Sequence, residues 1–227
     1  MRYLTILLLL LLAASVILPA QAEEKAAGRP WEGKTWFVFG DSITSMGYYI
    51  DPVNEELGTV SVKYDHSGYD FPQLAAVWQE MLDADFGPDL ITIFAGTNDF
   101  GHGTPIDETA NAVRVILKGL YTKYPSTQII IITPLQRNSD PEIHPEETEG
   151  LGPNKQGKYL ADYVEVIREA ARDFGTPCLD LYACGGINIV NAREKTVGGD
   201  GLHPSAEYGP VLGHIIAQFI LNYAPMN

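Results

Sequence analysis

The sequence predicts an α/β domain in which helices cover both faces of a parallel β-sheet. Two features carry this prediction. Short runs of consecutive apolar residues, rich in β-branched side chains, end near glycine or proline, which is typical of strands buried on both faces. Segments with the apolar spacing of a helix separate these runs, and strands that alternate with helices indicate a parallel sheet.

Four segments are expected to be buried strands, and a fifth is expected to lie at an edge. The clearest buried strand, residues 127–133, contains four consecutive isoleucines. Residues 59–64 alternate apolar and polar side chains, which predicts an edge strand with one covered face. The other buried strands are expected at residues 35–39, 89–95 and 177–182.

Apolar residues at helical spacing predict helices between the strands. Residues 72–82, for example, place Leu74, Val77 and Met81 on one face. Residues 135–153 show no periodicity and contain several proline, glycine and glutamate residues, so we expect a long surface loop, which is often functional in a compact domain. Further helices are expected at residues 107–124, 154–174 and 204–223.

The first 22 residues are organised like a secretory signal peptide. Arg2 precedes an unbroken leucine run, and Ala20-Gln21-Ala22 offers a small-x-small cleavage pattern. A membrane anchor is the alternative, but the apolar stretch is only marginally long enough to span a bilayer. We expect a secreted or periplasmic protein without stable membrane association after cleavage. Its parts would be a signal peptide at 1–22, a lead at 23–34 and one domain at 35–227.

Charge and composition exclude several classes of binding partner. Acidic residues outnumber basic ones by 29 to 15, and such a surface repels nucleic acid, anionic membranes and polyanionic glycans. A neutral substrate fits better, although acidity also simply aids solubility. The five histidines lack metal-ligand spacing, so we expect neither a metal nor a cofactor. The oligomeric state stays open.

The two cysteines, Cys178 and Cys184, are six residues apart. Extended chain over that separation covers about 20 Å, whereas a disulfide needs Cα atoms within about 7 Å. We therefore expect two buried thiols, each without a disulfide partner.

Two short motifs follow predicted strands. Gly40-Asp41-Ser42 comes after the first strand, and Gly96-Thr97-Asn98-Asp99 comes after the strand at 89–95. The carboxyl ends of parallel strands are where α/β proteins place ligands. Each motif by itself also fits a helix cap or a turn.

A third motif pairs Asp200 with His203 in a glycine-rich turn. At this spacing the carboxylate reaches the imidazole Nδ1 atom, which leaves Nε2 to accept a proton from a serine. Pro204 suits the first position of a helix, which would place His203 at the start of the last helix.

In this order the three motifs resemble the SGNH (GDSL-like) hydrolase superfamily. The resemblance implies a flavodoxin-like three-layer α/β/α sandwich with a five-stranded parallel sheet. It implies that Ser42 is the nucleophile of a serine esterase, His203 its base and Asp200 the orienting partner of the base. The Gly-x-Ser-x-Gly elbow of the other large esterase class is absent from the chain.

The resemblance also implies an oxyanion hole made by the Asn98 side chain and the Ser42 amide. The family completes this hole with a glycine after its second strand, and Gly68 is the best candidate. The family often has an asparagine a few residues earlier, where this chain has Tyr64-Asp65-His66.

The substrate is less well defined by the sequence. Export, acidity and nearby aromatic residues favour removal of short acyl groups, such as acetyl, from carbohydrate. The ester substrate would be a small molecule or a polysaccharide. A lysophospholipase or thioesterase with the same triad is an alternative, and so is a non-catalytic glycan-binding module. We expect Tyr48, Tyr69 and Phe100 to stack on sugar rings, with core packing as the alternative for each.

Overall fold

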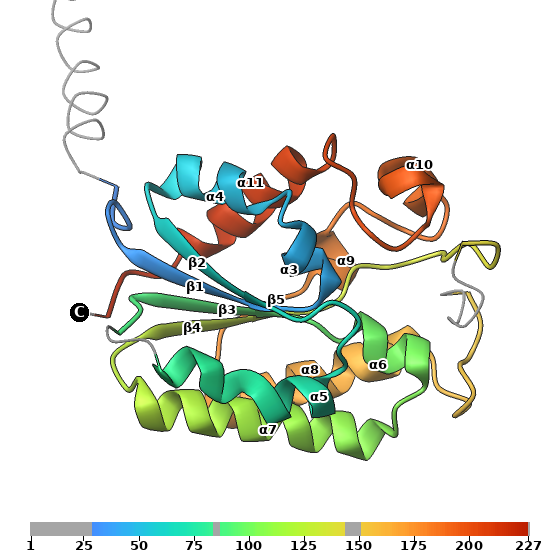
Figure 1. Ribbon diagram of the computed structural model, residues 1–227, viewed down its shortest axis with the longest axis horizontal. Helices are drawn as coiled ribbons and strands as arrows, with labels where there is room; N and C mark the ends of the chain where they lie inside the picture. Colours follow the sequence, from blue (N-terminus) through green and yellow to red (C-terminus); the bar gives the residue numbers. More distant parts are fainter. Residues whose placement is uncertain (1–28, 84–86, 144–150, 227) are drawn as a thin grey trace, which may run out of the picture.

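The computed structural model describes residues 29–83, 87–143 and 151–226. They form a three-layer α/β/α sandwich around one five-stranded sheet (Figure 1). The expected signal peptide at 1–22 lies outside the described residues. Within the described part of the chain, no helix is both long and apolar enough to cross a membrane.

All neighbouring strands of the sheet are parallel, in the order β2-β1-β3-β4-β5. The chain moves from β1 outward to β2 and then returns to the other side of β1 with β3. Ligands of open α/β sheets bind beyond the carboxyl ends of the strands at such a reversal. The strands are β1 (Thr35–Gly40), β2 (Val60–Asp65), β3 (Leu90–Phe94), β4 (Gln128–Ile132) and β5 (Cys178–Leu179).

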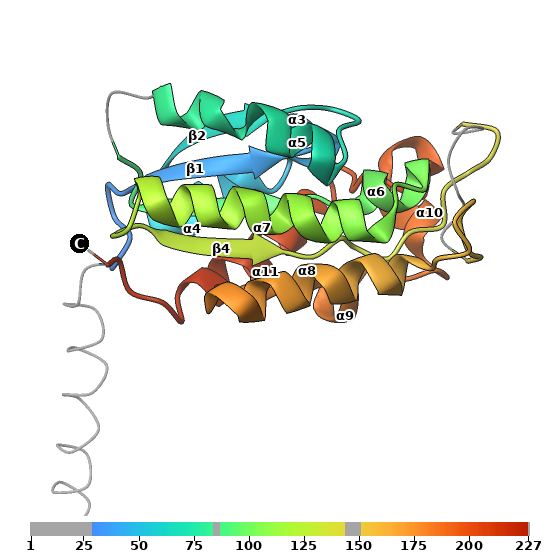
Figure 2. The same cartoon turned by 90° about the horizontal axis from the view of Figure 1, so that it is seen from below.

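Two helical layers bury the two faces of the sheet, as Figures 1 and 2 show. Trp36 and Val38 point into the core on one face, and Phe37 and Phe39 into the core on the other. The isoleucines of β4 divide between the cores in the same way, so its all-apolar sequence is explained by burial on both sides. One layer contains α5 (Phe71–Val77), α7 (Ile106–Lys123) and α8 (Leu160–Phe174); the other contains α4 (Ile50–Leu57) and α11 (Gly209–Ile220).

Several short helices, which the sequence reading did not separate, complete the fold. Figure 1 shows α3, α6 and α9 near the carboxyl ends of the strands. The short helices are α3 (Ser42–Met46), η1 (Trp78–Asp83), α6 (Thr97–His102), α9 (Leu181–Cys184), α10 (Ala192–Lys195) and η2 (Val197–Gly199).

The expected strand at 177–182 is too long. β5 has only two residues, because the Asp180 side chain accepts a hydrogen bond from the Ala183 amide and starts α9. Neither cysteine is in a disulfide, and Cys178 is partly buried. Cys184 is exposed, so the expectation of two buried thiols is wrong for that residue.

Two helices begin later than predicted. The turn before α8 is held by Asn154, whose side-chain amide donates to the Phe100 carbonyl and the Tyr163 hydroxyl. Pro204 is not the first residue of α11, because it pairs with Thr196 in an antiparallel bridge. His203 therefore lies in a loop rather than at the start of a helix.

Candidate active site

Ser42 is placed by a close approach of two strands. A Cβ atom at Gly40 would lie 2.4 Å from the Phe94 carbonyl oxygen, so only glycine lets β1 end this close to β3. The Asp41 side chain then accepts a hydrogen bond from the Ile43 amide at 3.0 Å and caps α3. Ser42 becomes the first residue of α3, half-buried at the carboxyl edge of the sheet.

Ser42, His203 and Asp200 form one hydrogen-bonded chain. The Ser42 Oγ atom lies 2.8 Å from His203 Nε2, and His203 Nδ1 lies 2.7 Å from Asp200 Oδ2. An ionised carboxylate only accepts hydrogen bonds, so the proton of the neutral imidazole is on Nδ1. The Nε2 lone pair then faces the serine hydroxyl, as a general base requires.

The carboxylate of Asp200 is ionised at neutral pH. Its burial favours a higher pKa, but hydrogen bonds from the His203 ring and from two backbone amides outweigh burial and lower the pKa of Asp200 to about 2. The amides are those of Leu202 and His203, which donate to Oδ1 at 2.8 and 3.0 Å. This negative charge stabilises a positive charge on the imidazole.

The segment after β4 holds the loop that carries Asp200. The Asn138 amide donates to the Gly201 carbonyl and the Asp140 amide to the Asp200 carbonyl, both at 2.9 Å. A Cβ atom at Gly201 would lie 1.8 Å from the Asn138 oxygen, and φ at Gly201 is +72°, so glycine is required there. The expected surface loop at 135–153 is therefore partly internal. Residues 144–150 of that loop lie outside the described residues.

Arg137 in this segment is a site residue that sequence reasoning missed. Its side chain is 1% exposed. The guanidinium donates to the Thr97 carbonyl at 3.0 Å and to Ser139 Oγ at 2.8 Å. It also lies 5.6 Å from the centre of the Phe100 ring. Arg137 thereby fixes the first turn of α6, which carries Asn98.

Asn98 is oriented by the loop that follows β2. Its Nδ2 atom donates to the Tyr69 carbonyl at 2.9 Å, and only the nitrogen of the amide can donate to a carbonyl. The same nitrogen carries a second N–H, which is left for a ligand. Asn98 itself is 2% exposed.

Two backbone amides accompany Asn98 at this edge. Gly68 lies in an exposed turn after β2, and Ser42 follows β1. Within the described residues, the backbone N–H groups of Ser42 and Gly68 have no protein acceptor. The predicted oxyanion donors thus follow three adjacent strands, β2, β1 and β3.

Asp99 links the helix that carries Asn98 to the segment that follows Gly68. Its carboxylate accepts from the Phe71 amide at 3.0 Å and from Thr109 Oγ1 at 2.7 Å. Complete burial raises the pKa of Asp99 to about 7, although the hydrogen bonds from Thr109 and Phe71 act in the opposite direction. Asp99 thus connects α6 to the start of α5, which comes directly after the turn that contains Gly68. The sequence motif did not indicate this role.

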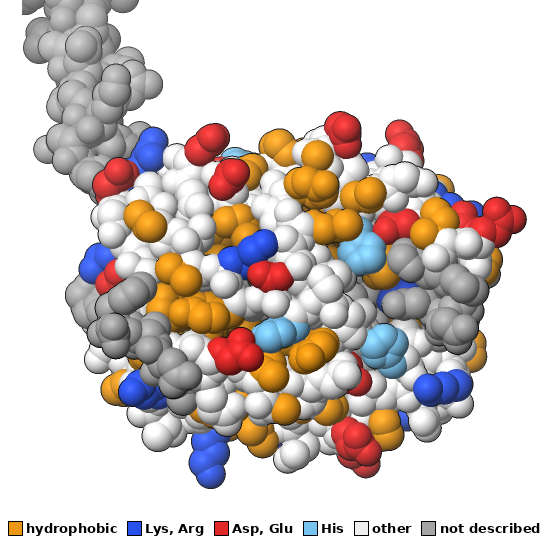
Figure 3. Space-filling view, in the orientation of Figure 1, with side chains coloured by type: hydrophobic (Ala, Val, Ile, Leu, Met, Phe, Trp, Pro, Cys, Tyr) orange, Lys and Arg blue, Asp and Glu red, His pale blue; other side chains and the backbone are white. Residues whose placement is uncertain are grey.

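The aromatic residues divide between surface and core. Tyr48 is 42% exposed. Tyr69 is partly buried and stacks on His66, with ring centroids 4.9 Å apart. On the face of the molecule drawn in Figure 3, histidine and hydrophobic side chains are both exposed among polar ones. Phe100 has no exposed surface and packs against Tyr163. Its predicted contact with a substrate is therefore wrong, because α6 buries that side chain against α8.

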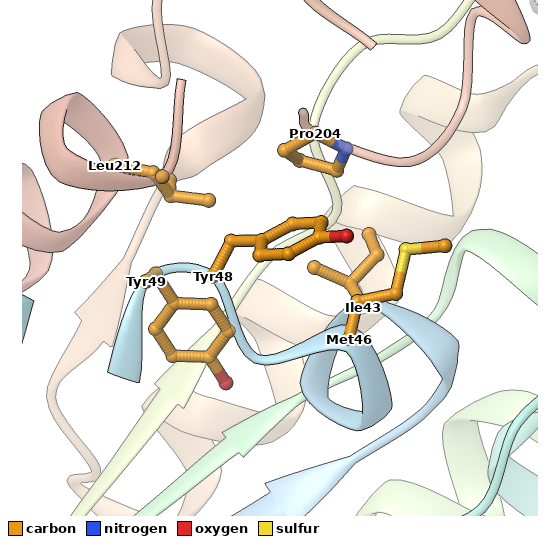
Figure 4. A pocket seen from close by; sticks show the side chains of 7 residues that line it. Ile43, Met46, Tyr48, Tyr49, Pro204 and Leu212 are labelled. Atoms are coloured by element: carbon orange, nitrogen blue, oxygen red, sulfur yellow. The ribbon is translucent and has the colours of Figure 1, made fainter. Parts of the chain in front are cut away.

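A small apolar cavity is lined by residues that directly follow the serine and the histidine, Ile43 and Pro204. Its volume is about 10 Å³, and Figure 4 shows the Tyr48 ring among the side chains that line it. The cavity is lined by Ile43, Met46, Tyr48, Tyr49, Pro204, Gly209 and Leu212. Tyr48 also lines a more polar hollow of about 300 Å³, together with Glu194, Thr196, Val197, Gly198, Ser205, Ala206 and Glu207.

The arrangement has the parts needed for acyl transfer. A serine hydroxyl bonded to a neutral imidazole is an activated nucleophile. Backbone and side-chain N–H groups at the same edge of the sheet are of the kind that stabilises a tetrahedral oxyanion. In the part of the chain that the structure describes, no three His, Cys, Asp or Glu side chains group as metal ligands.

Comparisons with known proteins identify the family of the chain. The sequence profile of the GDSL-like Lipase/Acylhydrolase family matches residues 38–208. Among curated protein sequences, none matches the chain.

Several solved structures share the fold. A possible lipase from Chitinophaga pinensis DSM 2588 is 22% identical, with a TM-score of 0.68 over 83% of this chain and 98% of that one. A lipase/acylhydrolase from Enterococcus faecalis is 24% identical, with a TM-score of 0.60 over 86% and 98%. The acetyl xylan esterase AlAXEase is 19% identical, with a TM-score of 0.62 over 81% and 98%. These likenesses confirm the predicted fold.

Proposed function

The chain belongs to the GDSL-like Lipase/Acylhydrolase family, and we propose that its Ser42, His203 and Asp200 remove short acyl groups, such as acetyl, from carbohydrate. The chain is a carboxylic ester hydrolase by family. The observation that carries the proposed triad is the continuous hydrogen-bonded chain from Ser42 Oγ to Asp200.

The first half of the reaction forms an acyl-enzyme. His203 Nε2 takes the hydroxyl proton as Ser42 Oγ attacks the ester carbonyl carbon, and 2.8 Å is within reach of a general base. The second N–H of Asn98 and the amides of Ser42 and Gly68 bind the negative oxygen. The bond to the alcohol then breaks, and the imidazolium of His203 gives its proton to the leaving oxygen.

The second half of the reaction restores the serine. A water molecule attacks the acyl carbon while His203 Nε2 accepts one of its protons. The tetrahedral species expels Ser42 Oγ, which recovers its proton from His203. The carboxylic acid leaves, and Asp200 stays ionised throughout.

Three observations support a short acyl group on a carbohydrate. The cavity beside Ser42 is small, and the partly exposed rings of Tyr48 and Tyr69 offer surfaces on which sugars stack. A structure of the same fold is an acetyl xylan esterase. We also propose export, on the pattern of the first 22 residues.

The test measures hydrolysis of p-nitrophenyl acetate and acetylated xylan. Ser42→Ala should remain folded by circular dichroism and lose activity, and a fluorophosphonate probe should label the wild type at Ser42. Ser45→Ala, three residues along α3, is the matched control, because the Ser45 hydroxyl donates to Asp65. Labelling at another serine, or full activity of Ser42→Ala, would overturn the assignment.

A further inference from the structure

We propose that the apolar cavity beside Ser42 is the acyl-binding pocket and that the Tyr48 ring is the wall that limits acyl chain length. This inference rests on the proposed function and deepens it by naming the residue that selects short acyl groups.

The cavity is built on the two segments that carry the nucleophile and the base. Its lining residues Ile43 and Pro204 directly follow Ser42 and His203, and consecutive Cα atoms are about 3.8 Å apart. Met46, also in the lining, lies four residues after Ser42 in α3, and residues at this spacing are neighbours on a helix surface. An acyl group attached to Ser42 Oγ is therefore within reach of the cavity.

The chemistry of the lining suits an acyl chain better than an alcohol. Burial of each methylene is worth about 0.8 kcal/mol, whereas a buried hydroxyl without a hydrogen-bond partner is destabilising. The space inside the cavity is about 10 Å³, which holds about one water-sized group and is far below the roughly 300–1,000 Å³ of pockets that bind drug-sized ligands. The cavity accordingly fits no more than the methyl group of an acetyl.

Tyr48 is in the lining of both this cavity and the polar hollow, which places it at the boundary between them. In Figure 4 its ring lies between Pro204 on one side and Ile43 with Met46 on the other. The backbone of Tyr48 is held close to α11, since a Cβ atom at Gly209 would lie 2.4 Å from the Tyr48 carbonyl oxygen. The ring is thus a wall on a fixed backbone.

Removal of the Tyr48 ring would join two spaces of different size. The cavity of about 10 Å³ would open into the hollow of about 300 Å³. A longer acyl chain would then extend past position 48 rather than stop there. Tyr48 is 42% exposed, so its replacement leaves the core intact.

The experiment compares kcat/KM of the full chain for p-nitrophenyl acetate, butyrate and octanoate. In the wild type, kcat/KM should fall from acetate to octanoate. Tyr48→Ala should raise the octanoate-to-acetate ratio by about tenfold or more, the scale on which pockets discriminate apolar length. Tyr48→Phe keeps the ring and should keep the wild-type ratio, as should Val211→Ala at an exposed position of α11.

Each outcome decides the matter. If folded Tyr48→Ala keeps the wild-type octanoate-to-acetate ratio of kcat/KM, the proposal is overturned. If that variant does not fold, Met46→Ala widens the same cavity from α3, and an unchanged ratio in that variant overturns the proposal equally. Failure of the proposed function looks different: the wild type would hydrolyse none of the esters, or Ser42→Ala would retain activity.

Discussion

Replacement of Asn98 by alanine removes two hydrogen bonds that act at different stages and can be measured separately. The first, from Nδ2 to the Tyr69 carbonyl at 2.9 Å, exists in the free enzyme. A hydrogen bond of this kind contributes about 1 kcal/mol to stability. In a chain of this length, that loss lowers Tm by about 2–4 °C.

The second hydrogen bond, from the other N–H of the same amide, forms with the oxyanion. Because it is made mainly in the transition state, Asn98→Ala should lower kcat by about 10²–10³-fold, or roughly 3–4 kcal/mol, with little change in KM. Asn98→Asp should be at least as harmful, since a carboxylate cannot donate to the Tyr69 carbonyl and repels the forming charge.

The assay determines kcat, KM and Tm together, with p-nitrophenyl acetate as substrate. Asn54→Ala is the control outside the site. The Asn54 amide donates one hydrogen bond, to Ser61 Oγ at 2.8 Å, and accepts one from Thr59 Oγ1 at 2.9 Å, at the amino end of β2. This substitution should lower Tm and leave kcat unchanged. The reasoning is refuted if folded Asn98→Ala retains a kcat within severalfold of the wild type, because Asn98 would then only hold Tyr69.

Two further predictions concern buried carboxylates. Asp200→Asn should lower kcat by about 10³–10⁴-fold without unfolding the protein, because the imidazole loses the acceptor that fixes its tautomer. The pKa of Asp200, lowered to about 2, makes its ionised form stabilising above pH ~4 and less so as pH falls toward 2. Urea denaturation should show that loss in the wild type and not in Asp200→Asn. The pKa of Asp99, raised to about 7, means that the folded state keeps a proton that the unfolded state releases, so stability should fall as pH rises from about 4 to 7. Asp99→Asn should reduce this dependence, and identical pH profiles of the two proteins would contradict the role of Asp99.

The sheet and the positions of the four motif residues could be predicted because local patterns determine them. The consecutive isoleucines of β4 require burial on both faces. Parallel strands then bring the residues after β1 and β3 to one edge, so Ser42 and Asn98 both lie at that edge. The three-residue spacing of Asp200 and His203 sets their contact within one turn.

The supporting residues could not be predicted, because their partners are backbone atoms far along the chain. Asp99 accepts from an amide 28 residues away, and Arg137 donates to a carbonyl 40 residues away. No local pattern marks such contacts. At Pro204 a local pattern was present but ambiguous. It fits the first residue of a helix as well as it fits the bridge to Thr196 that the structure contains.

The hydrogen bond between Ser42 and His203 joins residues 161 positions apart. Closing so long a loop costs chain entropy that only the assembled sheet and its helices can offset. Without its base, a serine hydroxyl is a weak nucleophile. A chain that ends before residue 200 contains Ser42 but lacks Asp200 and His203, so it should not hydrolyse esters. We therefore expect ester hydrolysis to appear late in folding, when the segments that carry Ser42 and His203 come into contact. Recovery of activity during refolding should report formation of the complete tertiary structure, rather than formation of either helical layer alone.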